Sequence, residues 1–318
     1  MAQPRDRSLL VKAARLYYEQ EQSQEQIAAA LGVSRSNVSR MLADAKNQGI
    51  VQIRVVEQAL RDTALEQRIK ELLPIRSVRV SRSLSSGDDQ NAVGALGATA
   101  LTERLRPNST IAFSWGTTLQ SVVDSVQPEY LPGIHLVPMA GGRTAFTPGV
   151  SAEDLIRQLA AKLSASFSSL YSPAVMSSRA ARDALVNEPS VAAVLEQAAR
   201  ADVAMVGIGS KRGSTTLEML QAAGLPPELY QRLTGPLAGD IAARLFDIDG
   251  RPLDHGWDDR IVGLNLEQIR RLPHVIGVAA GAGKALGVIG AARGGYVSEL
   301  VISGSCALAV IRHLDAQP

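Results

Sequence analysis

The segment "SQEQIAAALGVSRSNVSRML", residues 23–42, limits the fold of this chain more tightly than any other stretch. Ser23 precedes an apolar run and Gln26 follows three residues later, which is the pattern of a capping box at a helix start. Gly32 supplies the tight turn that ends this short helix, and Ser34 caps the next one. The spacing therefore predicts two helices joined by a sharp turn.

Apolar residues at helical spacing extend this unit in both directions. A preceding helix over residues 8–21 has one apolar stripe, formed by Leu9, Leu10, Ala13, Leu16 and Tyr17. The inward positions of the helix after Ser34 are expected to be Val38, Met41, Leu42 and Ala45. The three helices can close one small core.

The outward face of the helix after Ser34 has side chains that bind phosphates and base edges, with no acid before Asp44. The candidate DNA-binding residues are Ser34, Arg35, Ser36, Asn37, Ser39 and Arg40. Residues 1–60 hold eight basic and six acidic side chains, so the whole formal charge of +2 lies there. The alternative is a surface helical hairpin with a solvated polar face, but the caps, turn and inward positions together favour a recognition helix in the major groove.

The segment "IVQIRVV" after Gly49 alternates apolar and polar residues, which predicts a small wing. Residues 1–57 are therefore predicted to form a winged helix-turn-helix DNA-binding domain. One such head makes few phosphate contacts, so we expect at least a dimer on a palindromic, double-stranded operator. Apolar residues from 58 to 73 predict a connecting helix closed by Pro74, which makes 58–74 a linker.

Composition excludes several classes of protein. The chain has 318 residues, 46% of them hydrophobic, which is enough for a small domain and a larger one. Its single cysteine, Cys306, excludes an intrachain disulfide and a multi-cysteine metal site, and burial as a small hydrophobe is favoured over redox sensing. No apolar signal core opens the chain, and no apolar run is long enough to span a membrane, so we expect a cytoplasmic protein.

Residues 75–318 alternate strand and helix patterns, which predicts an α/β domain with a Rossmann-like, mostly parallel sheet covered on both faces. The predicted strands are 77–81, 110–116, 134–142, 201–210, 274–281 and 296–304. The predicted helices are 88–105, 117–126, 151–166, 283–292 and a last one from about 305. Ligands of such sheets bind at the carboxyl ends of the strands.

Glycine-containing loops are expected at those carboxyl ends: "SWGTTL", "MAGGRTAF", "VGIGSKRGS", "AGDIAARLFD" and "AAGAGK". Three of them offer backbone amides near a hydroxyl or a cation, and Asp240 could accept hydrogen bonds from hydroxyls, which suits a phosphorylated polyol. A tight strand-to-helix turn explains the glycines of any single loop. Their convergence at one edge favours a ligand site.

The head and the motifs "SWGTTL", "VPMAGG", "ADVAMVGIGS", "GDIAARLFDIDG" and "VIGVAAGAGKALGVIGAARGGYVSELVIS" resemble the SorC family of bacterial transcriptional regulators, sometimes grouped with DeoR. The resemblance implies that residues 75–318 form a sugar-phosphate effector-binding and oligomerisation domain. Its fold would be related to those of ribose-phosphate isomerase and glucosamine-phosphate deaminase, but the domain would not catalyse a reaction. It also implies a tetramer built from dimers.

The resemblance assigns roles to single residues. Gly116, Thr117 and Thr118 would hold a phosphate with Lys284 as its cation, Gly141, Gly142 and Arg143 would line the pocket, and Asp240 would accept sugar hydroxyls. The chain departs from the family at Leu245 and Phe246, where two aromatics are usual, and at Ser303 and Gly304, where an acidic "TD" pair is usual.

Three functions compete for these residues. The favoured one is a transcriptional regulator of a carbohydrate or polyol catabolic operon, controlled by a phosphorylated sugar or polyol, with repression and activation both open. An isomerase- or deaminase-like enzyme with an attached head would use Lys284 or Asp240, but a bound anion favours a charged lysine, and the four scattered histidines indicate neither a triad nor a metal site. A dinucleotide cofactor site fits poorly, because the glycines at 281, 283 and 287 miss its spacing. We therefore expect no catalytic residue, cofactor or metal.

Overall fold

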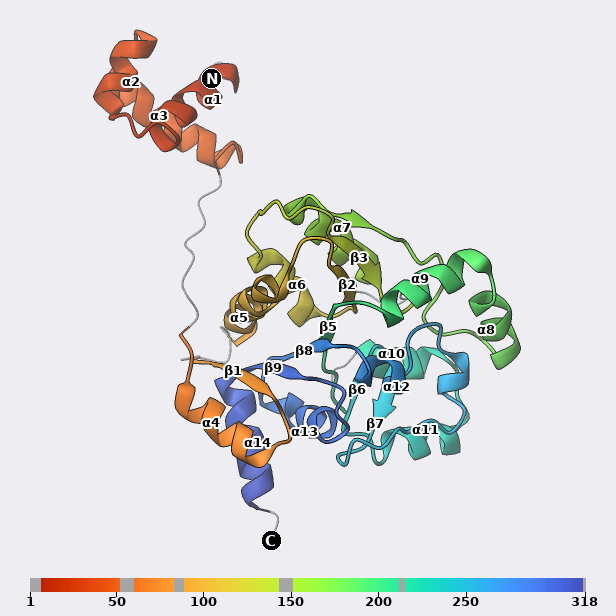
Figure 1. Cartoon of the computed structure of the whole chain (residues 1–318). Coiled ribbons are helices and arrows are strands. Elements are labelled where there is room, and N and C mark those ends of the chain that lie inside the picture. The colour runs from red at the N-terminus through yellow and green to blue at the C-terminus, as the bar shows by residue number, and fades with distance from the viewer. Residues whose placement is uncertain (1–6, 52–59, 83–88, 143–150, 212–214, 317–318) are drawn as a thin grey trace. The chain divides into compact units, whose positions relative to one another are not determined.

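The computed structural model describes residues 7–51, 60–82, 89–142, 151–211 and 215–316 (Figure 1). The chain divides into two compact units, Met1–Glu57 and Gln58–Pro318. Within the described ranges, no helix is both long and apolar enough to cross a membrane.

The smaller unit contains three helices, α1 (Arg7–Tyr18), α2 (Gln24–Leu31) and α3 (Arg35–Asn47). They enclose one core, to which the predicted inward residues contribute: Leu10, Ala13, Ile27, Val38, Met41, Leu42 and Ala45 are all buried. The apolar stripes read from the sequence are confirmed as the faces that make this core.

The turn between α2 and α3 has the predicted chemistry. The N–H of Gln26 donates to Ser23 Oγ at 3.3 Å, and the N–H of Ser23 donates to Gln26 Oε1 at 2.8 Å, which completes the capping box. Gly32 has φ +65°, a left-handed conformation that favours glycine. Ser34 caps α3 by accepting from the N–H of Asn37 at 3.3 Å. The wing predicted after Gly49 falls mainly on residues 52–59, outside the described ranges.

The larger unit is built on a seven-stranded sheet whose strand pairs are all parallel, as predicted. In spatial order its strands are β1 (Ser77–Ser81), β9 (Glu299–Ser303), β8 (His274–Ala279), β5 (Val203–Gly207), β2 (Thr110–Phe113), β3 (His135–Pro138) and β4 (Ser166–Phe167). The first and the last long strands of the domain, β1 and β9, are therefore neighbours.

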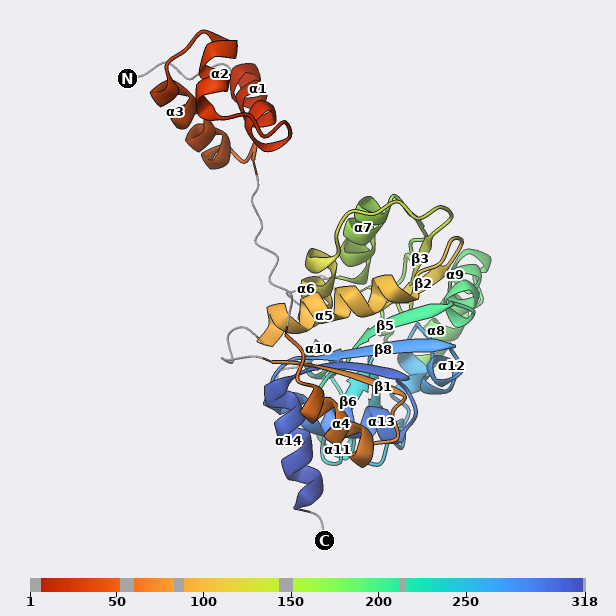
Figure 2. The ribbon, with the colours of Figure 1, turned by 60° about the vertical axis from the view of Figure 1, so that its left-hand side comes forward.

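Helices cover both faces of the sheet (Figure 2). One face packs on α5 (Asp89–Arg104), α6 (Thr117–Ser125) and α7 (Ala152–Leu163). The core on the other face contains buried residues of α4 (Thr63–Leu72), α9 (Pro189–Ala199), α10 (Thr215–Ala222), α11 (Pro227–Thr234), α12 (Leu266–Arg270), α13 (Ala285–Arg293) and α14 (Gly304–Asp315). Strand residues alternate between the two cores, so Ile111 and Phe113 lie in one and Ala112 in the other. Smaller elements are α8 (Arg179–Val186) and the 3₁₀ turns η1 (Asp258–Arg260) and η2 (Ala282–Lys284).

The segment expected as the loop "AGDIAARLFD" at a strand end forms instead a separate antiparallel hairpin, β6 (Gly239–Ile241) with β7 (Arg244–Phe246). Ala242 and Ala243 take φ of +50° and +66° at its turn. Such a turn favours asparagine or glycine, so two alanines gave no hairpin signal in the sequence.

The helix expected over 58–73 begins at Thr63, where Asp62 accepts from the N–H of Leu65 at 3.1 Å. It packs against β1 and α14, and thus within the larger unit. The segment before it runs antiparallel to the end of β1, because the N–H of Asp62 donates to Val80 O at 2.8 Å and the N–H of Arg82 to Leu60 O at 2.6 Å.

Candidate functional site

The candidate DNA-binding residues share the outward face at the start of α3. All of them are exposed except Asn37, which is half-buried. Arg35 makes an exposed 3.5 Å ion pair with Glu25, and Arg40 Nε donates to Ser36 O at 3.4 Å. Exposed pairs of this kind are weak. Both guanidinium groups can therefore turn to an external phosphate or base.

At the carboxyl edge of the sheet, the topology predicts a ligand-binding crevice between β2 and β5. The chain leaves β2 toward α6 on one face and leaves β5 toward α10 on the other. Such a reversal between neighbouring strands is where open α/β sheets bind ligands. The loops after β2, β3, β5 and β8 surround it.

The loop after β2 ends in an uncapped helix N-terminus. Gly116, with φ +139°, is the N-cap of α6 and gives it no side-chain cap. A Cβ at residue 116 would meet no atom within 4 Å, and Thr117 beside it is exposed. Among the described residues the space beside Gly116 is therefore open, and the helix dipole at this N-terminus favours an anion.

The loop after β8 repeats this arrangement at η2, which leads directly into α13. Gly281, with φ +94°, begins it without a side-chain cap. Gly283 has neither a left-handed φ nor any atom within 4 Å of where its Cβ would lie. Among the described residues neither the turn nor packing requires glycine at 283, and a glycine leaves room for a ligand to approach the backbone there.

Three glycines bring Asp240 to this edge through direct backbone contact. A Cβ at Gly209, in the loop after β5, would lie 1.7 Å from Asp240 Oδ1. A Cβ at Gly287 in α13 would lie 2.3 Å from Gly209 O, and one at Gly239 would lie 2.6 Å from the Cα of Gly287. Thr216 Oγ1 donates to Asp240 Oδ2 at 2.5 Å, which fixes one carboxylate oxygen.

Lys284 and Asp240 are close enough to interact electrostatically. Burial lowers the pKa of Lys284, while the nearby carboxylate of Asp240 acts to raise it. Among the described residues nothing hydrogen-bonds the Lys284 ammonium group. An anion held between the starts of α6 and α13 would stabilise its charge.

Cys306 is a buried residue of α14 and is close enough to Lys284 for the two groups to interact electrostatically. It is fully buried, and burial raises the pKa of its thiol to about 12. A thiol of this kind stays protonated and unreactive at neutral pH. The sequence interpretation of Cys306 as a small buried hydrophobe is confirmed.

The loop after β3 uses its amides within the protein. The N–H of Gly141 donates to Val262 O at 2.9 Å, and the N–H of Gly142 donates to Ser172 O at 2.7 Å. A pocket-lining role for these two glycines stays a prediction, and it would have to rest on other atoms. Arg143 lies outside the described residues.

Sequence reasoning missed Arg244, which holds the loop that accepts from the N–H of Gly141. Its buried guanidinium donates to the carbonyl groups of Leu264 at 3.0 Å, Gly263 at 2.9 Å and Asp258 at 3.0 Å. The same loop pairs with the end of β3 through Leu264 N–H and Met139 O at 2.9 Å. An arginine inside the apolar run "ARLF" gave no sign of this role.

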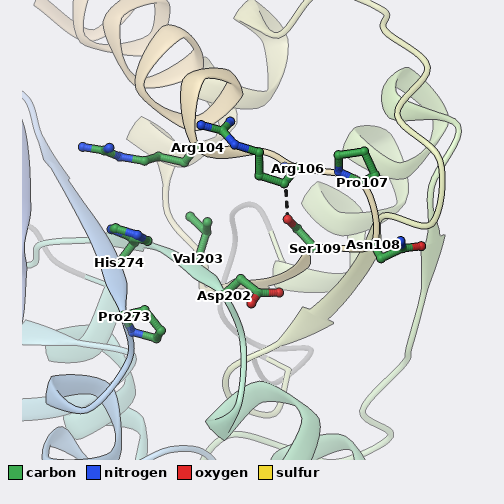
Figure 3. Close-up of a pocket in the computed structure, with 9 residues that line it drawn as sticks. All are labelled: Arg104, Arg106, Pro107, Asn108, Ser109, Asp202, Val203, Pro273 and His274. Atoms are coloured by element: carbon green, nitrogen blue, oxygen red, sulfur yellow. Dashed lines mark hydrogen bonds between the residues drawn. The ribbon is translucent and has the colours of Figure 1, made fainter.

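A hollow of about 390 Å³ lies at the opposite, amino end of the strands (Figure 3). Its charged groups are already partnered: Arg104 pairs with Glu299, Arg106 donates to Leu105 O, and Asp202 accepts from the N–H of Thr110. We therefore do not place a ligand there. The described ranges also hold no cluster of three potential metal ligands.

Comparison with known proteins finds a family model for each part of the chain. The family model described as "Putative sugar-binding domain" matches residues 57–312, and the model described as "Sigma-70, region 4" matches residues 4–48. The sorbitol operon regulator of Klebsiella pneumoniae is 30% identical over 302 residues, which cover 93% of this chain and 95% of that protein. The deoxyribonucleoside regulator of Bacillus subtilis is 28% identical, with 96% and 98% covered.

Solved structures show the same fold. The crystal structure of the full-length Klebsiella pneumoniae sorbitol operon regulator SorC superposes with a TM-score of 0.72 at 29% identity, covering 96% of this chain and 98% of that chain. The sugar-binding domain of a transcriptional repressor from Vibrio fischeri gives 0.72 at 27% identity, covering 80% and 100%. The chain therefore belongs to the SorC family of bacterial transcriptional regulators.

Proposed function

We propose that this chain regulates transcription of a carbohydrate or polyol catabolic operon and that a phosphorylated sugar or polyol controls its binding to DNA. One observation carries the proposal: two uncapped helix N-termini, of α6 and of η2 with α13, occur at one sheet edge beside Lys284. Relatives named as regulators of sorbitol and deoxyribonucleoside genes support the class of effector.

The phosphate of the effector would bind Gly116, Thr117, Thr118 and Lys284. Asp240 would accept hydrogen bonds from its hydroxyl groups, beside Gly141, Gly142 and Arg143. We assign the phosphate and the hydroxyl groups to different residues because helix N-termini and an ammonium group bind anions, whereas a carboxylate accepts hydrogen bonds from hydroxyls.

The head would bind operator DNA through Ser34, Arg35, Ser36, Asn37, Ser39 and Arg40. We propose a homo-oligomer, a dimer or a tetramer, that places two heads on one palindrome. Residues 1–57 would bind DNA, 58–74 would link, and 75–318 would bind effector and oligomerise. The coupling between effector and DNA is typically about 1 to 3 kcal/mol.

We propose binding without turnover, in the cytoplasm and with no cofactor. A catalytic lysine acts in its neutral form, which a lowered pKa favours. A phosphate between the two helix N-termini would reverse that shift, because the anion stabilises the ammonium form. Lys284 is then an anchor for the ligand.

Thermal shift of the full-length protein against a panel of sugar and polyol phosphates tests the proposal. Stabilisation by one phosphate that disappears in Lys284→Ala supports the effector site, whereas turnover of that compound refutes binding without catalysis. Replacing Arg35 and Arg40 with alanine should abolish specific DNA binding and leave this stabilisation intact. The control is Arg15→Ala, an exposed arginine of α1. Loss of both functions in the double variant would mean that the two roles are misassigned.

A further inference from the structure

A polar cluster at the carboxyl ends of β1 and β9 holds two buried atoms without hydrogen-bond partners. Ser81 ends β1 in register with Ser303 of β9, and Asp89 begins α5. Ser81 is 0% exposed and Asp89 is 4% exposed. Among the described residues neither Ser81 Oγ nor Asp89 Oδ1 has a partner. Buried polar groups in native proteins are normally satisfied, so these two indicate a missing group.

The remaining polar atoms of the cluster are already used. Ser305 Oγ donates to Asp89 Oδ2 and lies 3.0 Å from Ser303 Oγ. Ser303 Oγ accepts from the N–H groups of Gly281 at 2.9 Å and Cys306 at 3.2 Å. Asp89 makes no ion pair within the described part of the chain. One carboxylate oxygen and one hydroxyl are therefore left over.

This cluster adjoins the proposed effector site. The hydrogen bond from the N–H of Gly281 to Ser303 Oγ ties it to the loop that holds Lys284, and the N–H of Cys306 donates to the same oxygen. Asp240 interacts with the same Lys284 and lies against the loop after β5. The loop that holds Lys284 thus has one carboxylate, Asp240, toward β5. Toward β9 it is connected through the hydroxyls of Ser303 and Ser305 to a second carboxylate, Asp89.

We propose that Asp89 and Ser81 form a second hydroxyl-binding subsite, which selects sugar or polyol phosphates of five or six carbons over shorter ones. The inference rests on the proposed phosphate site. A carboxylate oxygen accepts and a serine hydroxyl both donates and accepts, which together match one hydroxyl of a polyol. β2 and β9 are three strand spacings apart, about 14 Å. A phosphate shared by α6 and Lys284 lies between the ends of β2 and β8, about two strand spacings or about 10 Å from β9. A three-carbon phosphate is shorter than this distance, whereas an extended five- or six-carbon chain comes close to it.

Calorimetric titration of the full-length protein tests the subsite with four probes: inorganic phosphate, glycerol 3-phosphate, ribose 5-phosphate and sorbitol 6-phosphate. Asp89→Asn should weaken the tighter of the two longer probes by about 10- to 100-fold, the range for a lost hydrogen bond to a charged group. Binding of inorganic phosphate and glycerol 3-phosphate should not change. Asp202→Asn, at the amino end of the strands, is the matched control and should bind all four probes like wild type.

A purely structural role for Asp89 predicts a different result. Asp89→Asn would then lower the melting temperature and leave the affinity ratio of long to short probes unchanged, which overturns the subsite. If Asp89→Asn does not fold, Ser81→Ala decides, because Ser81 Oγ has no partner in the described protein to lose. If no probe binds wild type, or all bind Lys284→Ala equally well, the phosphate site itself fails, and the subsite with it.

Discussion

Asp240 and Gly209 are in direct contact, and this contact places a carboxylate beside Lys284. The N–H of Gly209 donates to Asp240 O at 2.8 Å, and a Cβ at residue 209 would fall 1.7 Å from Asp240 Oδ1. No side chain larger than hydrogen fits there without moving the carboxylate. The glycine of the loop after β5 is thus explained by packing, whereas Gly283 in the loop after β8 is not.

Replacing these two glycines with alanine should weaken ligand binding in both cases but lower stability in only one. Gly209→Ala should lower the free energy of unfolding by about 1 to 3 kcal/mol through overpacking, and it should weaken effector binding by displacing Asp240. Gly283→Ala should change stability by less than about 0.5 kcal/mol and still weaken phosphate binding, because its Cβ enters the site. Urea unfolding and phosphate titration measure the two effects. Equal destabilisation by both variants would contradict the assignment.

Burial of Lys284 predicts a pH-dependent stability. Its pKa is lowered in the folded protein, so the charged lysine opposes folding at all pH values below that folded pKa. As the pH rises from the folded pKa to the ordinary value, only the unfolded chain keeps the proton, and stability increases. Lys284→Met should therefore be more stable than ligand-free wild type at pH 7, by a margin that shrinks near pH 10. Urea unfolding at both pH values is the measurement, and a variant that is less stable at pH 7 would refute the argument.

Local rules predicted the head well because its signals are local. Caps, a left-handed glycine and apolar spacing each act within a few residues, and Ser23, Gly32 and Ser34 all have the predicted roles. The same holds for six of the seven strands of the large sheet, whereas the two-residue strand β4 was missed because a helix was predicted over residues 151–166. The β6–β7 hairpin was missed because its turn is made by alanines.

The candidate site was predictable only in part. Gly116 and Lys284 lie in motifs that can be read along the chain. The cluster of Ser81, Asp89 and Ser303 depends on the pairing of β1 with β9, which are more than 200 residues apart in the sequence. No periodicity reports which strands become neighbours. Unpartnered atoms likewise become visible only when all surrounding groups are placed.

The turn of the head gives a prediction that depends on backbone conformation alone. Gly32 has φ +65°, and a Cβ there would meet no atom within 4 Å. Gly32→Ala should therefore destabilise the head by about 1 kcal/mol through strain, while Gly32→Asn should recover part of the loss, since asparagine tolerates this region. Hydrogen exchange of the α2 and α3 amides in the full-length protein reports the change. Equal exchange rates in Gly32→Ala and Gly32→Asn would mean that steric effects, and not the backbone preference of the residue, determine the loss of stability.

The edge strand that holds Ser81 depends on a buried ion-pair cluster. Glu299 of β9, whose side chain is 3% exposed, pairs with Arg79 of β1 and with Arg104 of α5, each at 2.9 Å. Glu103 pairs with the same Arg79, but its side chain is 52% exposed. Glu299→Gln leaves two arginines without their buried partner, so we expect a loss of about 3 to 5 kcal/mol.

Glu103→Gln is the matched control and should cost less than about 1 kcal/mol, because water screens an exposed pair and Arg79 keeps Glu299. Urea unfolding gives both values, and hydrogen exchange in β1 should rise in Glu299→Gln alone. Since β1 places Ser81 beside Ser303, the same variant should also lose its preference for longer sugar phosphates. A Glu299→Gln protein with intact β1 protection and unchanged ligand preference would show that this cluster does not hold the edge of the sheet in place.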